Sequence, residues 1–256
     1  MQHLTILTGA SRGMGLAMAR QLLAPDGLLL CLARQTNPDL DQAATRAGAP
    51  LLQWSQDLAD TTGARDRLTA WLRQQDARAF GSATLINNAG VLPAIVPLAD
   101  CPPDQLGNAL RVGLEAPMHL TAAFLAVTRE WVANGWRGPR KVLNISSGLG
   151  RHAMASQAPY CAAKAGLDHF TRCCALEEAG DPAGARLVSL APGVIDTDMQ
   201  VQLRGSDAAG FPDRQRFVDL REKGLLSTPD EAAAKVLAWL QRPGFGDQPV
   251  ADVREG

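Results

Sequence analysis

The residues of this chain best suited to chemistry are a tyrosine and a lysine spaced one helical turn apart. Tyr160 is the only tyrosine in 256 residues, and Lys164 is one of only four lysines. The spacing places both side chains on one face of a helix expected over residues 157–179. An ammonium group beside a phenol favours the phenolate, so we expect Lys164 to lower the pKa of Tyr160 from about 10. Such a phenol can donate and accept a proton near neutral pH. The ordinary alternative is a buried tyrosine with an exposed lysine one turn away.

A serine at the end of a predicted strand offers a third polar group. Ser147 follows the run Lys141–Ser146 and precedes Tyr160 by thirteen residues. Its hydroxyl can polarise a substrate carbonyl or stabilise a developing alkoxide. Taken alone, two consecutive serines are better explained by turn formation. Together with Tyr160 and Lys164, Ser147 indicates acid–base chemistry on a carbonyl.

The first predicted strand, Leu4–Thr8, runs directly into a glycine-rich turn that opens a helix. Glycines in such a turn permit tight folding, close approach of backbone amides to a pyrophosphate, and close packing of helix on strand. An ordinary βα turn is the alternative, but the position after the first strand favours a dinucleotide site. The residues expected to contact the dinucleotide here are Gly9, Ser11, Arg12, Gly13, Met14 and Gly15.

The end of the second predicted strand bears on which dinucleotide is bound. NAD-specific sites usually place a carboxylate here for the ribose 2′-hydroxyl, but this chain reads Ala33-Arg34-Gln35. Arg34, together with Arg12, suits a 2′-phosphate by charge and shape, so we expect NADP as the cofactor. The alternative is that both are ordinary solvated surface arginines, since the chain has 21 arginines in all. Asp57-Leu58, after the third strand, is expected to contact the adenine.

Short apolar runs alternate with longer helical stretches along the whole chain. The predicted strands are Leu4–Thr8, Leu28–Ala33, Leu51–Trp54, Thr84–Asn87, Lys141–Ser146, Arg186–Ala191 and Val250–Val253. Helices are expected near residues 13–24, 39–47, 61–75, 104–133, 157–179 and 229–241. This alternation predicts an α/β fold with one doubly wound parallel sheet of the Rossmann type, in a single domain over residues 1–256. The least regular segment, 193–224, is expected to cover the substrate.

Composition excludes several classes of function. The 25 basic and 26 acidic side chains leave a net charge of −1, so we expect no nucleic-acid partner. No uninterrupted apolar stretch reaches about 18 residues, so no membrane association is expected. The five cysteines form no Cys-x-x-Cys pair and no secretory signal is visible, which favours reduced thiols and a cytoplasmic location. The four histidines form no metal-binding pattern, so no metal is expected.

The order and spacing of these motifs resemble those of the short-chain dehydrogenase/reductase family. The matching motifs are Thr8-Gly9-x-x-x-Gly13-x-Gly15, Asn87-Asn88-Ala89-Gly90, Asn144-Ile145-Ser146-Ser147, Tyr160-x-x-x-Lys164 and Pro192-Gly193-x-x-x-Thr197. They span essentially the whole chain. Three further segments look most like the branch of sepiapterin reductases and bacterial benzil reductases, namely 191–200, 220–226 and 250–253.

The resemblance implies a role for each motif. Tyr160 is expected to act as the acid/base, Lys164 to lower its pKa and bind the nicotinamide ribose, and Ser147 to orient the carbonyl. Asp252 falls where sepiapterin reductases anchor the pterin, although Val253-Arg254 replaces the usual aromatics. Further cofactor contacts implied by the family are Asn88, Ala89, Gly90, Gly193, Val194, Ile195 and Thr197. Helices 104–133 and 157–179 form the dimer interface in this family, which implies a homodimer or a dimer of dimers.

The chain departs from the family at one catalytic position. The family carries an Asn in the helix after Asn87–Gly90, where this chain has Gly113. Pro117 has no N–H to donate to the carbonyl four residues earlier, so we expect the Gly113 oxygen to remain free and to bind a relay water.

The favoured function is an NADPH-dependent carbonyl reductase that acts on a small-molecule ketone or 1,2-diketone. One alternative is an NADP-binding regulatory or scaffold protein whose catalysis is impaired at Gly113. Another is an NAD-dependent alcohol or steroid dehydrogenase, which Arg34 disfavours.

Overall fold

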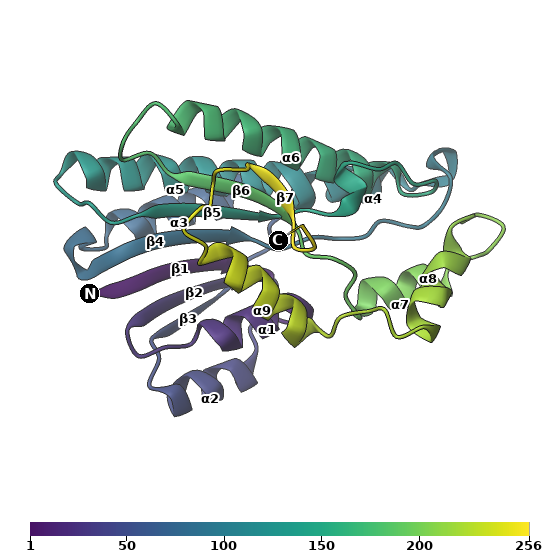
Figure 1. Ribbon diagram of the computed structural model, residues 1–256, viewed down its shortest axis with the longest axis horizontal. Coiled ribbons are helices and arrows are strands. Elements are labelled where there is room, and N and C mark those ends of the chain that lie inside the picture. The colour runs from purple at the N-terminus through teal and green to yellow at the C-terminus, as the bar shows by residue number, and fades with distance from the viewer. Residues whose placement is uncertain (256) are drawn as a thin grey trace.

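Seven parallel strands form one continuous sheet at the centre of the molecule (Figure 1). The computed structural model describes residues 1–255. The strand order is β3-β2-β1-β4-β5-β6-β7. The chain first adds β2 and β3 on one side of β1 and then crosses back to place β4 on its other side, so the switch point lies between β1 and β4. The predicted doubly wound sheet is therefore confirmed, and ligands in such sheets bind at this switch point. The strands are β1 (Gln2–Thr8), β2 (Gly27–Ala33), β3 (Leu51–Ser55), β4 (Phe80–Asn87), β5 (Arg140–Ile145), β6 (Arg186–Ala191) and β7 (Val250–Asp252).

Helices cover both faces of the sheet (Figure 1). One face carries α1 (Gly13–Leu22), α2 (Pro38–Ala47) and α9 (Pro229–Leu240). The other carries α3 (Thr61–Arg73), α5 (Ala116–Ala133) and α6 (Ala158–Glu178). The strands between them are buried on both sides, which explains their nearly continuous apolar sequences.

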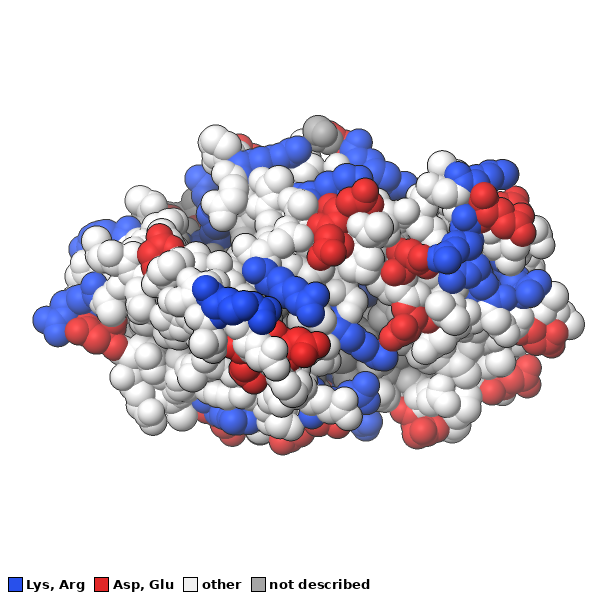
Figure 2. Space-filling model, turned by 90° about the horizontal axis from the view of Figure 1, so that it is seen from below, with Lys and Arg blue, Asp and Glu red and all other residues white. Residues whose placement is uncertain are grey.

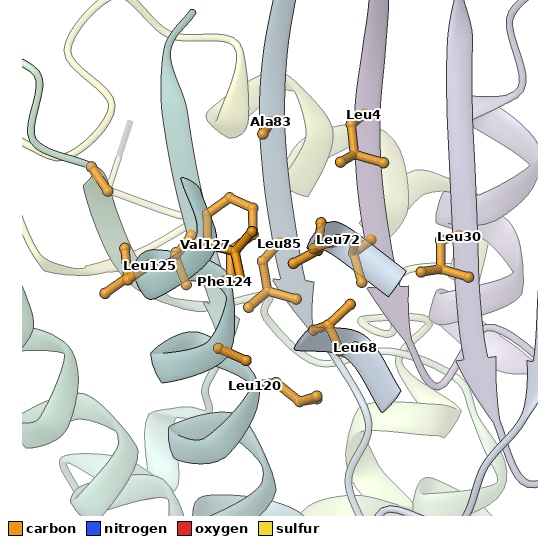
Figure 3. Packing of buried hydrophobic residues seen from close by; sticks show 14 of the residues in the cluster. Leu4, Leu30, Leu68, Leu72, Ala83, Leu85, Leu120, Phe124, Leu125 and Val127 are labelled. Atoms are coloured by element: carbon orange, nitrogen blue, oxygen red, sulfur yellow. The ribbon is translucent and has the colours of Figure 1, made fainter. Parts of the chain in front are cut away.

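Alternating residues of each strand supply the two cores. In β1, Leu4 and Ile6 face α3 and α5, whereas Leu7 faces α1 and α9. Figure 3 shows Leu68 of α3 and Phe124 of α5 converging on the first of these cores, and both are fully buried. This double packing holds the carboxyl ends of the strands in fixed relative positions.

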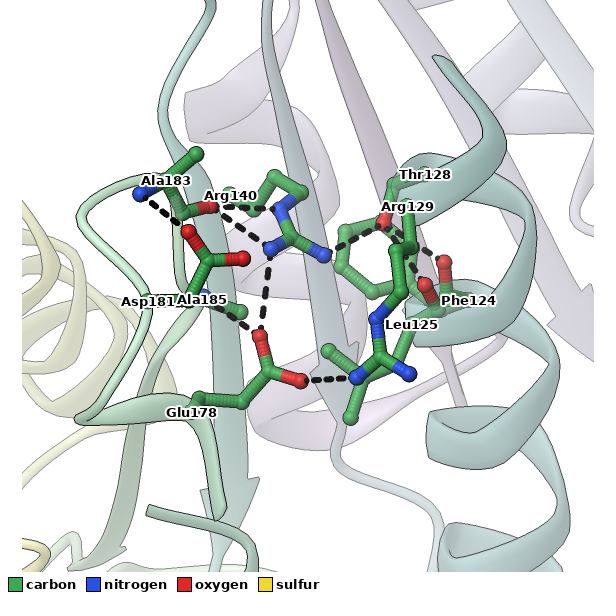
Figure 4. A network of polar contacts seen from close by, with 9 residues as sticks. All are labelled: Phe124, Leu125, Thr128, Arg129, Arg140, Glu178, Asp181, Ala183 and Ala185. Carbon is green, nitrogen blue, oxygen red and sulfur yellow. Dashed lines mark hydrogen bonds and ion pairs between the residues drawn. The ribbon is translucent and has the colours of Figure 1, made fainter. Parts of the chain in front are cut away.

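A buried ion pair holds the far end of α6 against β5 (Figure 4). Arg140 begins β5, and its guanidinium lies 3.1 Å from the carboxylate of Glu178, with both side chains at most 3% exposed. Arg140 also donates to the Ala183 carbonyl at 2.6 Å, and Glu178 accepts from the Ala185 amide at 2.8 Å. Because these charges are paired and hydrogen-bonded, the contact fixes α6 in place without leaving an isolated buried charge.

The long helix predicted over residues 104–133 is interrupted. It consists of α4 (Pro103–Leu110), a π-helical turn η3 (Arg111–Glu115) and α5. In the turn, the Ala116 amide donates to the Arg111 carbonyl, which accommodates the missing N–H of Pro117. The stretch Pro103–Ala133 is long and apolar enough to cross a membrane, judged by length and composition alone. In the structure it packs against α3, α6 and the sheet.

The segment 193–224 is more regular than predicted. It contains α7 (Asp198–Gly205) and α8 (Arg214–Glu222), which lie beyond the carboxyl ends of the strands (Figure 1). A small apolar core holds the two helices together, and the rings of Phe211 and Phe217 stack in it with centroids 5.7 Å apart. The sequence showed only a charged, proline-interrupted segment, because these helices are short and their few apolar residues pack against each other.

Candidate active site

A cleft of about 1160 Å³ opens between the carboxyl ends of the strands and the helices α7 and α8. Every site residue predicted from the sequence lines this cleft, from the glycine-rich turn at one end to Asp252 at the other. The β1, β4, β5 and β6 ends contribute to it because parallel strands end at the same edge. Seen from below, acidic and basic side chains are interspersed over the molecular surface (Figure 2).

Two positions of the glycine-rich turn, Gly9 and Gly15, have no room for a side chain. Gly9 and Gly13 have φ of +72° and +55°, which L-residues rarely adopt. A Cβ at Gly9 would lie 2.9 Å from the Ala89 Cα, and one at Gly15 would lie 2.0 Å from the Gly9 carbonyl oxygen. No side chain caps the amino end of α1, where helix N–H groups face the cleft. The turn therefore fits the pyrophosphate of a dinucleotide.

The turn after β4 is tied to the end of β1. The Thr8 hydroxyl accepts hydrogen bonds from the amides of Asn88 (2.9 Å) and Ala89 (3.0 Å). The Asn88 side chain donates back to the Thr8 carbonyl at 3.0 Å. Gly90 follows, and a Cβ there would lie 3.9 Å from the Lys164 Nζ. These contacts place Asn88–Gly90 between the glycine-rich turn and Lys164.

The two arginines predicted to select NADP differ in their contacts. Arg34 is exposed, and within residues 1–255 its side chain has no ion pair. Arg12 is also exposed, but its guanidinium lies 2.9 Å from the carboxylate of Asp198 on α7. No local feature of the sequence points to Asp198 as a partner. Asp57 is exposed after β3 and accepts a hydrogen bond from the Ala59 amide at 2.9 Å.

Ser147, Tyr160 and Lys164 come together on one wall of the cleft. Ser147 ends the β5 segment and caps the short helix η4 (Gly148–Gly150) by accepting from the Leu149 amide at 3.2 Å. Tyr160 and Lys164 project from the first turns of α6, with the ammonium 5.7 Å from the phenol ring centroid. The Lys164 Nζ donates to the Ile145 carbonyl at 2.7 Å. This bond holds the lysine at the end of β5.

Burial dominates the electrostatics of this trio. Burial raises the pKa of Tyr160, and the neighbouring Ser147 hydroxyl opposes this shift. Burial also lowers the pKa of Lys164 to about 8, with the charge of Asp168 acting in the opposite direction. The protein's own groups thus raise the pKa of the Tyr160 phenol, whereas the sequence analysis expected it to be lowered. The reason is that the spacing showed the lysine next to the tyrosine but not how far both are removed from water.

Gly113 packs directly on the catalytic helix. It lies in the π-helical turn, and a Cβ at this position would be 3.1 Å from the Cβ of Ala163, the residue before Lys164. That distance is shorter than nearly all real Cβ contacts. The glycine therefore allows η3 to approach α6 more closely than an Asn in the same backbone would. Whether the Gly113 oxygen binds a relay water stays a prediction.

Asp252 lines the cleft but its carboxylate is already paired. It is buried, and its two oxygens accept from the Arg254 Nε at 2.7 Å and the Arg254 Nη2 at 2.6 Å. Arg151 approaches the same carboxylate to 3.6 Å. The hydrogen bonds from Arg254 lower the pKa of Asp252, so it stays ionised at neutral pH. A substrate that used Asp252 as an anchor would have to displace Arg254.

A group of apolar side chains forms part of the cleft wall. These side chains come from four separate segments and are Val91, Leu92, Leu149, Met154, Met199, Phe217 and Leu220. Met199, Phe217 and Leu220 belong to the segment 193–224 that the sequence predicted to cover the substrate. The other four were not singled out, because they are ordinary apolar residues that only the tertiary fold brings together. Within residues 1–255 no cluster of three metal-ligating side chains occurs.

Comparison with known proteins agrees with this geometry. The family model for short chain dehydrogenase matches residues 3–208. The chain belongs to the short-chain dehydrogenase family. This short-chain dehydrogenase is 32% identical to benzil reductase ((S)-benzoin forming) of Bacillus cereus, over 98% of both chains. It is 31% identical to sepiapterin reductase of Meriones unguiculatus, over 94% of this chain and 92% of the relative. The resemblance to this branch, inferred from the motifs, is thereby confirmed.

Solved structures of the family share the fold and bind both nicotinamide cofactors. The Brucella melitensis 3-oxoacyl-[acyl-carrier protein] reductase in complex with NAD superposes with a TM-score of 0.79 at 25% identity, covering 99% of this chain and 96% of that one. A putative 2-deoxy-d-gluconate 3-dehydrogenase from Agrobacterium tumefaciens with bound NADP gives 0.77 at 25% identity, covering 98% and 94%. This short-chain dehydrogenase is therefore an oxidoreductase of a fold that accepts either cofactor.

Proposed function

We propose that the protein is an NADPH-dependent carbonyl reductase that converts a ketone or 1,2-diketone to the corresponding alcohol. The observation that carries this proposal is that Ser147, Tyr160 and Lys164 line the same cleft as a glycine-rich turn that leaves two of its positions no room for a side chain. The similarity to benzil reductases supports a diketone as the substrate. The apolar wall formed in part by Leu92, Met154 and Phe217 suits its hydrocarbon portion.

The proton chemistry is assigned to the trio. The Ser147 hydroxyl donates a hydrogen bond to the substrate carbonyl oxygen and so fixes its position. The Tyr160 hydroxyl then transfers its proton to that oxygen as the carbonyl carbon is reduced. The Lys164 ammonium stabilises the phenolate that remains. When bound, NADPH supplies the hydride that the carbonyl carbon accepts.

The cofactor is held by contacts spread along the cleft. The amides at the start of α1 bind the pyrophosphate, and Lys164 binds the nicotinamide ribose. Arg34 faces the 2′-phosphate, and its lack of a carboxylate partner within residues 1–255 leaves its charge available. The helices α7 and α8, here called the lid helices, would cover the substrate, because Met199 of α7 and Phe217 and Leu220 of α8 line the cleft.

The direct test is a spectrophotometric assay of NADPH oxidation with benzil, 1-phenyl-1,2-propanedione and simple aryl ketones. We expect turnover of at least one diketone, and loss of nearly all activity in Tyr160→Phe. Turnover of alcohols with NAD, but of no carbonyl with NADPH, would favour the alcohol dehydrogenase alternative. Tight NADPH binding by a folded protein that reduces none of these compounds would favour the regulatory alternative.

A further inference from the structure

Asp168 is a buried carboxylate that has no role in the proton chemistry proposed above. It lies four residues after Lys164 on α6 and is 1% exposed. Its Oδ1 accepts hydrogen bonds from the hydroxyls of Ser146 (2.5 Å) and Ser189 (2.6 Å). Its Oδ2 is buried and has no hydrogen-bond partner among residues 1–255. A buried carboxylate with an unused oxygen is destabilising unless a cation lies nearby.

Lys164 is the cation on the same helix face. Residues four apart on a helix are neighbours, so the lysine and Asp168 occupy successive turns. Gly150 of η4 covers this stretch of α6, since a Cβ there would lie 2.7 Å from the Asp168 Oδ2 and 3.0 Å from the Lys164 carbonyl oxygen. Both side chains are almost fully buried, with Lys164 4% and Asp168 1% exposed, so the interaction of their charges is screened less than at the surface.

Several of the other charged groups on the surrounding elements have partners of their own. Arg151, after η4, pairs with Asp252 of β7, which also binds Arg254. On η3, Glu115 accepts from the Thr61 hydroxyl at 2.9 Å. The remaining titratable side chains of α4, η3 and the neighbouring turns of α6 are Asp104, Arg111, Tyr160, Cys161, His169 and Arg172. Among the described residues, it is the charge of Asp168 that opposes the effect of burial on the Lys164 pKa.

We propose that Asp168 is a positioning residue whose negative charge keeps Lys164 protonated during turnover. This rests on the proposed function, in which the lysine ammonium supports the Tyr160 phenolate. Ser146 and Ser189 stabilise the charge of Asp168 by donating hydrogen bonds to it. The carboxylate thus acts on the reaction only through the lysine and touches neither substrate nor cofactor.

The test measures the protonation of Lys164 without turnover. The protein is labelled with ¹³C-lysine, and the four Cε signals are titrated by NMR, with Lys164 assigned by its absence in Lys164→Met. We expect Asp168→Asn to lower the Lys164 pKa by at least about one unit. The matched control, Ser189→Ala, removes a hydrogen bond but no charge and should change it by less than about half a unit. An unchanged Lys164 pKa in a folded Asp168→Asn protein would overturn the proposal.

A second substitution keeps the test decisive if Asp168→Asn does not fold. Asp168→Ser removes the same charge but keeps a polar side chain next to the hydroxyls of Ser146 and Ser189. It should likewise lower the Lys164 pKa by at least about one unit. An unchanged Lys164 pKa in a folded Asp168→Ser protein would equally refute the proposal.

Activity then separates positioning from a purely structural role. Asp168→Asn should reduce the diketone within about threefold of the wild-type rate at pH 6, and at least about tenfold more slowly at pH 8.5. An equal loss at both pH values would indicate a structural role and contradict the proposal. Since the NMR titrations need no substrate, they stand even if no diketone is reduced, so failure of the proposed function is distinguishable.

Discussion

The carboxylate of Asp198 lies 2.9 Å from the guanidinium of Arg12, although 186 positions separate them in the sequence. This ion pair joins the glycine-rich turn to α7, the first lid helix, across the mouth of the cleft. Arg12 is one of the two arginines proposed to hold the 2′-phosphate. In the proposed function, Asp198 and the 2′-phosphate of NADPH would therefore compete for the same guanidinium.

Asp198→Asn should consequently strengthen NADPH binding. Both side chains are about two-thirds exposed, and an exposed ion pair contributes at most about 1 kcal/mol. We expect the Kd for NADPH, measured by fluorescence quenching, to fall by up to about fivefold, with little change for NADH. Glu222→Gln, which removes an exposed charge from α8, is the control. Weaker binding of both cofactors would instead show that the pair closes the lid over them.

Arg34→Ala should weaken NADPH binding selectively. A charge-assisted contact to the 2′-phosphate contributes about 1.5–3 kcal/mol, so NADPH affinity should fall about tenfold or more. NADH affinity should be nearly unchanged, because NADH lacks this phosphate. The exposed Arg46 of α2 provides the control as Arg46→Ala. Equal losses for both cofactors would rule out the phosphate role.

Tyr160→Phe should keep the fold and the affinity for NADPH but lose about 10²–10⁴-fold in activity, the usual contribution of acid–base catalysis. Because Tyr160 is the only tyrosine, ultraviolet titration of the protein reads its ionisation directly. In the free protein we expect the phenol to ionise above pH 10, since burial raises its pKa. With NADP⁺ bound, the midpoint should move downward. A midpoint that stays above pH 10 in the complex would contradict the assigned role of Lys164.

Gly113→Asn should destabilise the protein because Ala163 leaves too little room. The new Cβ would lie 3.1 Å from the Ala163 Cβ, and overpacking of this kind costs about 1–3 kcal/mol. The double variant with Ala163→Gly should recover part of that loss in thermal unfolding, with a coupling of at least about 0.5 kcal/mol. If instead Gly113→Asn folds normally and raises kcat a hundredfold, the relay in the wild type is defective and the regulatory alternative gains support.

The rate of carbonyl reduction should depend on pH through the protonation of Lys164. Burial lowers the pKa of this lysine from 10.5 to about 8, so the ammonium is present below that pH and lost above it. The kcat/KM for NADPH, which reports the free enzyme, should be level below about pH 8 and fall about tenfold for each pH unit above it. Level activity up to pH 10 would show that the lysine charge is dispensable.

The strands, the glycine-rich turn and the pairing of Tyr160 with Lys164 could be predicted from the sequence, because each follows from local chemistry. The seven strands were predicted because buried parallel strands need apolar residues on both faces. The glycine-rich turn could be recognised because glycine readily adopts a φ such as the +72° at Gly9 and tolerates the close approach at Gly15. Tyr160 and Lys164 are paired by helical spacing alone. Each of these features depends on residues close together in the chain.

Features that depend on contacts between distant residues, or on burial, were decided only by the tertiary structure. Arg12 meets Asp198, and Asp168 meets Ser146 and Ser189, only because helices and strands far apart in sequence pack together. The pKa directions of Tyr160 and Lys164 follow from the exclusion of water, which no spacing reveals. The lid helices α7 and α8 are stabilised because the few apolar residues of this polar segment, Leu203, Phe211 and Phe217, pack together in one small core. Sequence patterns record local geometry, whereas desolvation and long-range pairing exist only after the chain has folded.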